Sequence, residues 1–441
     1  MILSRVVTGV SELAAVRAEV SEAVVATVRE ILEGVRDADD RQACVASYAR
    51  KFDAREAVEF ELFVEPEELE RARVEPRHHD AIREAIRRVW AFHEAQLKVL
   101  TSAMRQRGTT FEWSIPPTEN SIGFEGQRLT PVRYAGVYVP GGKAVYPSSV
   151  IMNAVPALVA GVERIVLATP PLPDGTLHPA VLVTAREVGI FKIVKAGGAY
   201  GIGALALGLG PAMPPCDVVA GPGNVYVNEA KRQLWGQVGL DLYAGPSEVA
   251  VYVDRSSDPR LAAADLLTQV EHAEDNIAYL VATDRASFDR VLVEAERQLA
   301  GSPREAIMRA ALRTCGVGVL VATEDEAADV INAVAPEHVS LLGGDPQGMA
   351  DLIRNAGALL LGAFSAQSAG DFAAGPSHTL PTGRAARFAS PVNVLTFMKL
   401  TSVSQLQAGD LMEMLPTIEA FGEMEGFPTH ARGAKVRFED R

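Results

Sequence analysis

Residues 191–223 read FKIVKAGGAYGIGALALGLGPAMPPCDVVAGPG, and this stretch determines the fold class. A short β-branched run is followed by a glycine-rich turn, an apolar segment of helical length and a second β-branched run. Parallel strands need a crossover connection, usually a helix, so strands that alternate with helices are typical of a parallel sheet covered by helices. The stretch therefore predicts an α/β fold.

The same alternation continues in both directions along the chain, as two series. In the first series, strands are expected at 134–140, 164–170, 191–198 and 217–223. In the second series, strands are expected at 248–254, 277–283, 316–323, 338–343 and 358–364. We therefore expect two α/β units in tandem, with a helical N-terminal segment before them and a helical tail after about residue 385.

The composition limits the kinds of protein that this chain can be. Its 441 residues are too many for one ordinary core, so two or more domains are expected. A net charge of −14 repels phosphate backbones and argues against a nucleic-acid partner. The three cysteines lie far apart without a CxxC motif, which indicates reduced thiols in a cytoplasmic protein. Charged residues interrupt every long apolar stretch, so neither a signal peptide nor a membrane span is expected.

A pair of side chains in DLLTQVEHAED suggests a metal site. Gln269 and His272 lie three residues apart in this stretch, which reads as helix, so both side chains are expected on one face. An amide oxygen and an imidazole nitrogen can bind one metal ion together. Two ligands do not make a site, and the best candidates for more are Asp371, in the Gly/Pro-rich loop 370–383, and His430, in EGFPTHA.

Glu337 and His338 form an adjacent acid/base pair just before an expected strand. Imidazole titrates near neutral pH and suits general base catalysis. Neighbours on an extended segment point to opposite sides, so the two residues need not touch. They are either two separate catalytic groups at one cleft or a surface glutamate beside a packed histidine, and the sequence favours neither.

Gly/Pro-rich loops follow several expected strands. The loops 138–149, 196–203 and 220–224 lie where α/β folds place their ligand crevice, and glycine lets a phosphate approach the backbone. Each loop alone is more typical of a tight turn than of a binding loop, and no GxGxxG motif with a downstream acid occurs. Together they favour nucleotide binding. Ser247, in the further loop 244–248, is either a substrate contact or a turn serine.

Taken together, these motifs resemble the histidinol dehydrogenase family. The segments that carry the resemblance are YVPGGKAVYPSSVIMNAVPA, VVAGPGNVYVNEAKRQ, AGPSEVAV, DLLTQVEH, APEHVSLL, AGDFAAGPSHTLPT and EGFPTHA. Their order and spacing also fit, over nearly the whole chain. The resemblance implies a homodimeric enzyme with one Zn²⁺ per subunit. Such an enzyme uses NAD to oxidise L-histidinol to L-histidine through the aldehyde.

The resemblance also implies roles for single residues. The implied zinc ligands are Gln269, His272, Asp371 and His430, and the implied catalytic residues are Glu337 and His338. The implied substrate contacts are Ser247, Gln269, His272, His338, Asp371, Glu425 and His430. The implied NAD contacts are Tyr138, Tyr200 and Asn224. In this family the C-terminal tail of one subunit completes the site of the other, so Glu425 and His430 would act across the dimer interface.

The resemblance implies a domain division as well. We expect an N-terminal helical arm (1–25), a discontinuous first α/β domain (26–136 and 247–385), a second α/β domain with the NAD loops (137–246) and an intersubunit helical tail (386–441). The two α/β domains would be incomplete Rossmann-like units.

Some positions depart from the family pattern and leave an alternative open. Tyr200 stands where the family usually has a glutamine, Ala366 where it has a proline and Phe372 where it has a tyrosine. These changes favour a homologue that uses the same zinc–NAD chemistry on another small polar alcohol, such as a sulfonated diol. Glu425 favours histidinol, because a carboxylate there can pair with a substrate ammonium. A non-catalytic binding protein is the third hypothesis, but it has no need of the Glu337–His338 pair.

Overall fold

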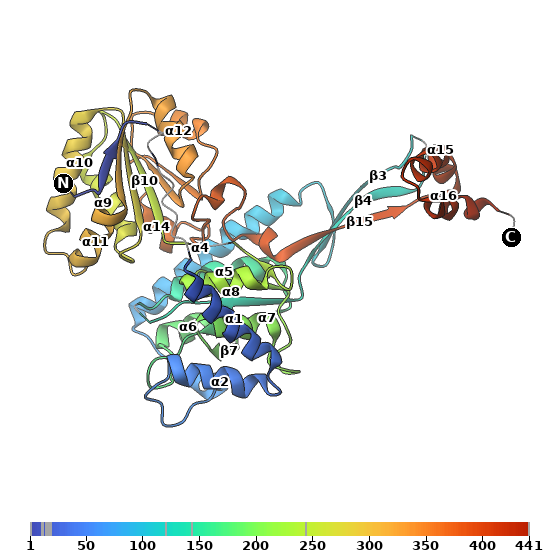
Figure 1. Cartoon of the computed structure of the whole chain (residues 1–441), viewed down its shortest axis with the longest axis horizontal. Coiled ribbons are helices and arrows are strands. Elements are labelled where there is room, and N and C mark those ends of the chain that lie inside the picture. The colour runs from blue at the N-terminus through green and yellow to red at the C-terminus, as the bar shows by residue number, and fades with distance from the viewer. Residues whose placement is uncertain are drawn as a thin grey trace. The chain divides into compact units, whose positions relative to one another are not determined.

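The computed structural model describes residues 2–9, 13, 20–119, 121–142, 144–242 and 245–439. The chain divides into two compact units, of which the first comprises Met1–Gln96 and Val132–Phe397 and the second Leu97–Pro131 and Met398–Arg441 (Figure 1). None of the described helices has both the length and the apolar run that crossing a membrane requires.

The first unit contains a five-stranded parallel sheet in the order β7-β6-β5-β8-β9. Its strands are β5 (Tyr134–Tyr138), β6 (Arg164–Thr169), β7 (Lys192–Lys195), β8 (Val218–Ala220) and β9 (Gly239–Leu240). One face packs against α1 (Glu22–Asp37), α2 (Arg41–Phe52), α7 (Gly198–Leu207) and α8 (Val225–Leu234). The other face packs against α3 (Pro66–Arg71), α4 (Pro76–Leu100), α5 (Pro147–Ala160) and α6 (Pro179–Val188).

The sequence explains why both faces of this sheet are covered. Along β6, Val166 and Ala168 pack into the first core and Leu167 into the second, so the strand is apolar on both sides. The helices carry matching apolar stripes. In α1 the buried residues recur at helical spacing, as Val28, Ile31, Leu32 and Val35. Full burial of each such side chain contributes roughly 1.5–3 kcal/mol to stability.

The first unit also contains a six-stranded parallel sheet, in the order β1-β12-β11-β10-β13-β14. Its strands are β1 (Arg5–Val7), β10 (Glu248–Val253), β11 (Ile277–Ala282), β12 (Gly316–Leu320), β13 (His338–Leu341) and β14 (Ala358–Leu361). One face packs against α9 (Pro259–Val270), α10 (Arg285–Leu299) and α11 (Glu305–Cys315), and the other against α12 (Glu324–Val334) and α13 (Pro346–Leu352). The short helices α14 (Gln367–Phe372), η2 (Ala385–Arg387) and η3 (Val394–Phe397) follow.

The second unit is built on an antiparallel sheet in the order β15-β4-β3-β2. Its strands are β2 (Arg105–Arg107), β3 (Thr110–Ile115), β4 (Phe124–Pro131) and β15 (Met398–Gln405). The helices α15 (Ala408–Met424) and α16 (Pro428–Lys435) and the short η4 (Val436–Phe438) complete it. This unit therefore joins two segments that lie far apart in the sequence.

The predicted α/β fold with parallel sheets is confirmed, and each of the nine expected strands is present. Other expectations need correction. The expected N-terminal helical arm contains the strand β1, and α1 begins only at Glu22; residues 1, 10–12 and 14–19 of the arm lie outside the described residues. The tail expected to be helical begins with η2, η3 and β15. Three-residue β1 is too short to show a period. The apolar residues of β15 are divided between its two sides, with Met398 and Leu400 on one and Val403 on the other, so neither strand gives a clear pattern.

The expected domain boundaries also differ from the structure. The boundary between 136 and 137 falls inside β5, and the boundary between 25 and 26 falls inside α1. Residues 97–131, which we assigned to the first α/β domain, belong to the second unit instead. Both parallel sheets lie in one compact unit, so the expected separation into two α/β domains stays a prediction.

Candidate active site

The two parallel sheets meet at one large cavity of about 1950 Å³ within the first unit. The five-stranded sheet contributes the carboxyl ends of its strands, through Tyr138 and the loops that contain Gly198 and Asn224. The six-stranded sheet contributes the opposite ends, because Glu248, Ile277 and His338 are the first residues of β10, β11 and β13. The cavity thus lies between the carboxyl ends of one sheet and the amino ends of the other.

The predicted cofactor contacts Tyr138 and Asn224 both line this cavity. The buried hydroxyl of Tyr138 accepts a hydrogen bond of 3.0 Å from the N–H of Gly198, and burial raises its pKa. Asn224 is the N-cap of α8, where its Oδ1 accepts hydrogen bonds from Tyr226 and Val227 at 3.0 and 3.2 Å. Its amide nitrogen is not used by the cap, so Asn224 can still donate to a ligand.

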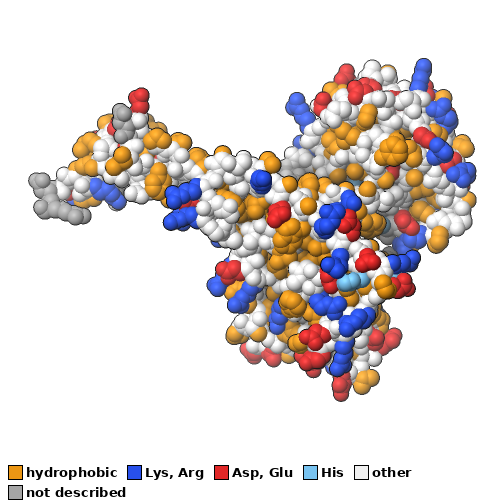
Figure 2. Space-filling view, turned by 180° about the vertical axis from the view of Figure 1, so that it is seen from behind, with side chains coloured by type: hydrophobic (Ala, Val, Ile, Leu, Met, Phe, Trp, Pro, Cys, Tyr) orange, Lys and Arg blue, Asp and Glu red, His pale blue; other side chains and the backbone are white. Residues whose placement is uncertain are grey.

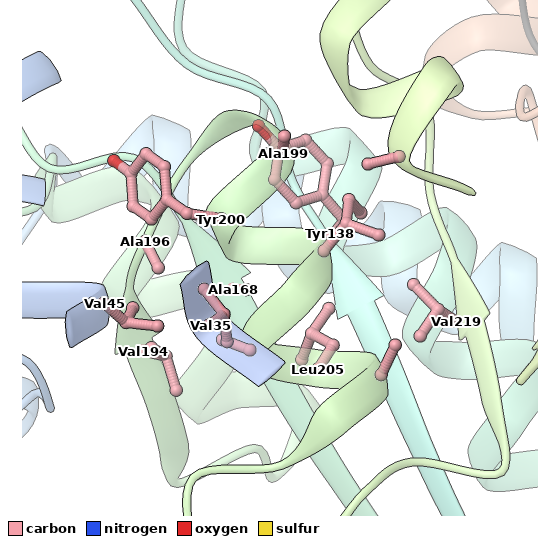
Figure 3. Close-up of a cluster of buried hydrophobic side chains, with 14 of the residues drawn as sticks. Val35, Val45, Tyr138, Ala168, Val194, Ala196, Ala199, Tyr200, Leu205 and Val219 are labelled. Atoms are coloured by element: carbon pink, nitrogen blue, oxygen red, sulfur yellow. The ribbon is translucent and has the colours of Figure 1, made fainter. Parts of the chain in front are cut away.

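Tyr200 also lines the cavity, and most of its ring is buried in the core of the five-stranded sheet. Figure 3 shows the rings of Tyr138 and Tyr200 above a cluster of small aliphatic side chains. The ring of Tyr200 stacks on Tyr48 and Phe52, with centroid distances of 5.9 and 6.2 Å. Its hydroxyl donates a hydrogen bond to Asp53, whose pKa is raised by burial to about 6. The stacking on Tyr48 and Phe52 and the hydrogen bond to Asp53 therefore fix the position of the Tyr200 ring.

Glu337 and His338 are both buried at the amino end of β13 and line the cavity. The Nδ1 of His338 lies 3.7 Å from Oε2 of Glu337, and its Nε2 lies 3.5 Å from Oδ1 of Asp371. Burial raises the pKa of Glu337 to about 7, although the charge of His338 opposes the shift. Burial alone would lower the pKa of His338, but the two carboxylates outweigh it and the pKa is raised. The alternative that Glu337 is a surface glutamate is wrong, because its side chain is buried.

The segment that contains Ser247 and Glu248 supports Glu337. The N–H of Glu248 donates to Oε2 of Glu337 at 3.0 Å, and the hydroxyl of Ser247 is hydrogen-bonded to the same carboxylate. Glu248 is itself buried, and burial together with the charge of Glu337 raises its pKa to about 8. Sequence reasoning missed Glu248, although it is the last residue of the AGPSE loop that drew attention to Ser247.

The three proposed metal ligands of the first unit line the same cavity. Gln269 is buried in the last turn of α9, whereas His272 lies in the turn that follows, since the helix ends at Val270. The two residues are thus not on one helix face as expected. Asp371 lies on the helix α14 rather than in a loop. The carboxylate of Asp371 opposes the lowering of the His272 pKa that burial causes, and the charge of His272 helps to lower the pKa of Asp371.

The donors of these three side chains fit a zinc ion. An amide, an imidazole and a carboxylate offer the nitrogen and oxygen donors that zinc accepts. Gln269 is 1% exposed, and its Nε2 has no hydrogen-bond partner in the described part of the chain, which is costly. A cation cannot satisfy this N–H donor, so a metal ion would be bound by the amide oxygen of Gln269. Among the described residues no three His, Cys, Asp or Glu side chains form a group that could hold a metal ion.

The remaining predicted site residues, Glu425 and His430, lie in the second unit. Glu425 is exposed at the C-cap of α15. His430 is exposed on α16, where its ring lies 5.2 Å from that of Phe427. All the predicted site residues of the first unit therefore line one cavity. Glu425 and His430 are the two predicted site residues that do not belong to this unit.

The sequence profile of the histidinol dehydrogenase family matches residues 15–438. The chain belongs to this family. It is 41% identical over 418 residues to a histidinol dehydrogenase of Synechococcus sp., with 93% of this chain and 92% of the relative covered. It is 42% identical over 413 residues to that of Bacillus subtilis, with 93% and 92% covered.

A solved structure shows the same relationship. The crystal structure of histidinol dehydrogenase from Elizabethkingia anophelis matches with a TM-score of 0.90 at 32% identity, and the match covers 99% of this chain and 98% of that chain. The predicted membership of the histidinol dehydrogenase family is therefore confirmed. The protein is an oxidoreductase, and its family is that of an enzyme of histidine biosynthesis.

Proposed function

We propose that the protein is a zinc-dependent and NAD-dependent dehydrogenase that oxidises L-histidinol to L-histidine through the aldehyde. The observation that carries this proposal is the position of His338, buried between the carboxylates of Glu337 and Asp371 in a cavity with two sets of functional groups. One set, Gln269, His272 and Asp371, suits a metal-bound substrate, while the other, at the glycine-rich loops, suits a dinucleotide.

His338 and Glu337 have different roles in the proposed reaction. His338 takes the proton of the substrate hydroxyl, and the two neighbouring carboxylates stabilise the imidazolium that forms. Glu337 then activates the water that adds to the aldehyde, and His338 acts as base again in the second oxidation. When bound, NAD accepts a hydride in each oxidation, and zinc holds the imidazole and the amine of the substrate. Ser247 and the N–H of Glu248 keep the carboxylate of Glu337 in place.

We further propose that the active form is a homodimer with shared sites, in which Glu425 and His430 of one subunit reach the cavity of the other. The second unit supports this proposal, because it exposes large apolar side chains that a second copy can cover (Figure 2). Those more than half exposed are Val99, Ile115, Ile122, Leu400, Met412, Phe421, Met424 and Phe427. The two parallel sheets would be incomplete Rossmann-like units, and the cytoplasm remains the predicted location.

The test is NADH formation by the purified protein with L-histidinol and with a panel of small diols, before and after treatment with a zinc chelator. We expect turnover of L-histidinol that the chelator abolishes and added Zn²⁺ restores. Turnover of a diol without turnover of L-histidinol would overturn the substrate, and activity that survives removal of the metal would overturn the zinc assignment.

A further inference from the structure

Three buried polar side chains form a layer beneath the active site, which we call the support layer: Asp265 on α9, Ser340 on β13 and Gln367 on α14. They are 8%, 0% and 0% exposed. The Nε2 of Gln367 donates to Oγ of Ser340 at 3.3 Å. Burial raises the pKa of Asp265, while hydrogen bonds from the hydroxyl of Ser340 and the backbone N–H of Gln367 oppose that shift. The Ser340 hydroxyl thus both accepts and donates, and the carboxylate of Asp265 closes the network.

Each residue of the support layer lies on the same helix or strand as one residue of the active site. On α9, Asp265 precedes Gln269 by four residues, and on α14, Gln367 precedes Asp371 by four. Residues four apart lie above one another on the same helix face. On β13, Ser340 follows His338 by two residues, which places both side chains on the same face of the strand. Each member of the layer is therefore paired with one residue of the site.

The helix α14 depends on this layer more than the other two elements do. It has only six residues, and its N-cap, Ala366, has no side chain that can accept a hydrogen bond from the first turn. The carboxylate of Asp265, on a neighbouring helix, interacts with the N–H of Gln367, the first residue of α14, and so supports the end of the helix that its N-cap side chain leaves unsupported. Because α14 also packs against α9, the position of Asp371 relative to Gln269 is set through Asp265.

We propose that Asp265, with Ser340 and Gln367, is a positioning residue that holds Gln269, His338 and Asp371 in the geometry required for metal binding and proton transfer. The inference rests on the proposed function for the identity of the ligands. It does not need that function for the structural claim that Asp265 anchors α14. Residues that orient metal ligands commonly change metal affinity by about 10–100-fold when they are replaced.

The test uses Asp265→Ala and the isosteric Asp265→Asn in the full-length protein. Asp254→Asn is the matched control, because Asp254 is also a hydrogen-bonded carboxylate but lies away from the cavity, directly after the carboxyl end of β10. It accepts hydrogen bonds from the N–H groups of Ser256 and Gly344, both at 2.8 Å. Two quantities are measured: hydrogen exchange of residues 367–372 in metal-free protein, and Zn²⁺ affinity by competition with a chromophoric chelator.

We expect exchange in 367–372 to be at least about tenfold faster in Asp265→Ala than in wild type or in Asp254→Asn. Zn²⁺ affinity should fall by about 10–100-fold in Asp265→Ala, less in Asp265→Asn, and not in the control. Unchanged exchange in 367–372 would overturn the inference, as would unchanged Zn²⁺ affinity in both Asp265 variants. If the wild type binds no Zn²⁺, the proposed function loses its metal, and the exchange measurement in metal-free protein still decides whether Asp265 anchors α14. If Asp265→Ala does not fold, Asp265→Asn decides both measurements.

Discussion

The Nε2 of His338 lies 3.5 Å from Oδ1 of Asp371, so one imidazole connects the proposed base to a proposed metal ligand. The other ring nitrogen faces Glu337 at 3.7 Å. The proposed base therefore lies within 4 Å of a proposed metal ligand and of the second catalytic carboxylate. A substrate alcohol held by the ligand set would therefore present its hydroxyl to His338.

Replacement of His338 by glutamine should separate chemistry from metal binding. The variant His338→Gln keeps a polar side chain of similar reach but has no titratable group, so NADH formation should fall by about 10²–10⁴-fold. Its zinc content, measured by elemental analysis, should equal that of the wild type, because His338 is not among the ligands. Loss of zinc in this variant would show that the two roles are assigned wrongly.

The pH dependence of the reaction should report the buried Glu337. This carboxyl has a pKa raised to about 7 and must be ionised to act as a base. The rate with the aldehyde as substrate should therefore rise with pH and level off above about pH 7. A profile already flat from pH 5 would exclude Glu337 as the base. The variant Glu337→Gln should lose this limb and most of the rate of the second oxidation.

Asp53 should make the stability of the protein depend on pH. Its pKa is raised from 3.8 to about 6, so the folded state binds the proton more tightly than the unfolded chain. Stability from this group is fully present below the unfolded value and is lost as the pH rises towards 6. The variant Asp53→Asn should therefore be more stable than wild type at pH 7 by roughly 1–2 kcal/mol, and equal to it near pH 4. A difference in melting temperature that does not change with pH would contradict this account.

A complementation experiment tests the shared site. The variants His338→Gln and His430→Asn should each be nearly inactive as homodimers. If the tail of one subunit serves the cavity of the other, a mixed dimer has one site with both defects and one intact site. Random mixing after dissociation should then restore about a quarter of the wild-type activity. No recovery in confirmed mixed dimers would place His430 in the site of its own subunit.

The parallel sheets could be predicted from the sequence because their strands are buried on both faces. Runs such as EVAVYV in β10 are continuous and apolar, and the helices between them have the right length. The antiparallel sheet of the second unit gave no such signal, since β15 is exposed over most of its length. It also pairs with β4, which lies far away in the sequence, and a single sequence does not reveal such a pairing.

The sequence could predict which residues line the cavity, but not how their side chains are arranged. The glycine-rich loops follow the rule that ligands bind at the carboxyl ends of parallel strands, and Tyr138 and Asn224 line the cavity there. His338 lies at the amino end of β13, so that rule would not have found it. The contact of His338 with Asp371 and the support by Asp265 join segments distant in sequence, and only the fold brings them together.

The most direct test of the central claim is the stoichiometry of the reaction with L-histidinol. We predict that the zinc-loaded protein forms two NADH for each L-histidine, measured by absorbance and by chromatography of the product, and that His338→Gln forms neither at a comparable rate. Absence of L-histidine from the products of the active, zinc-loaded protein would contradict the account.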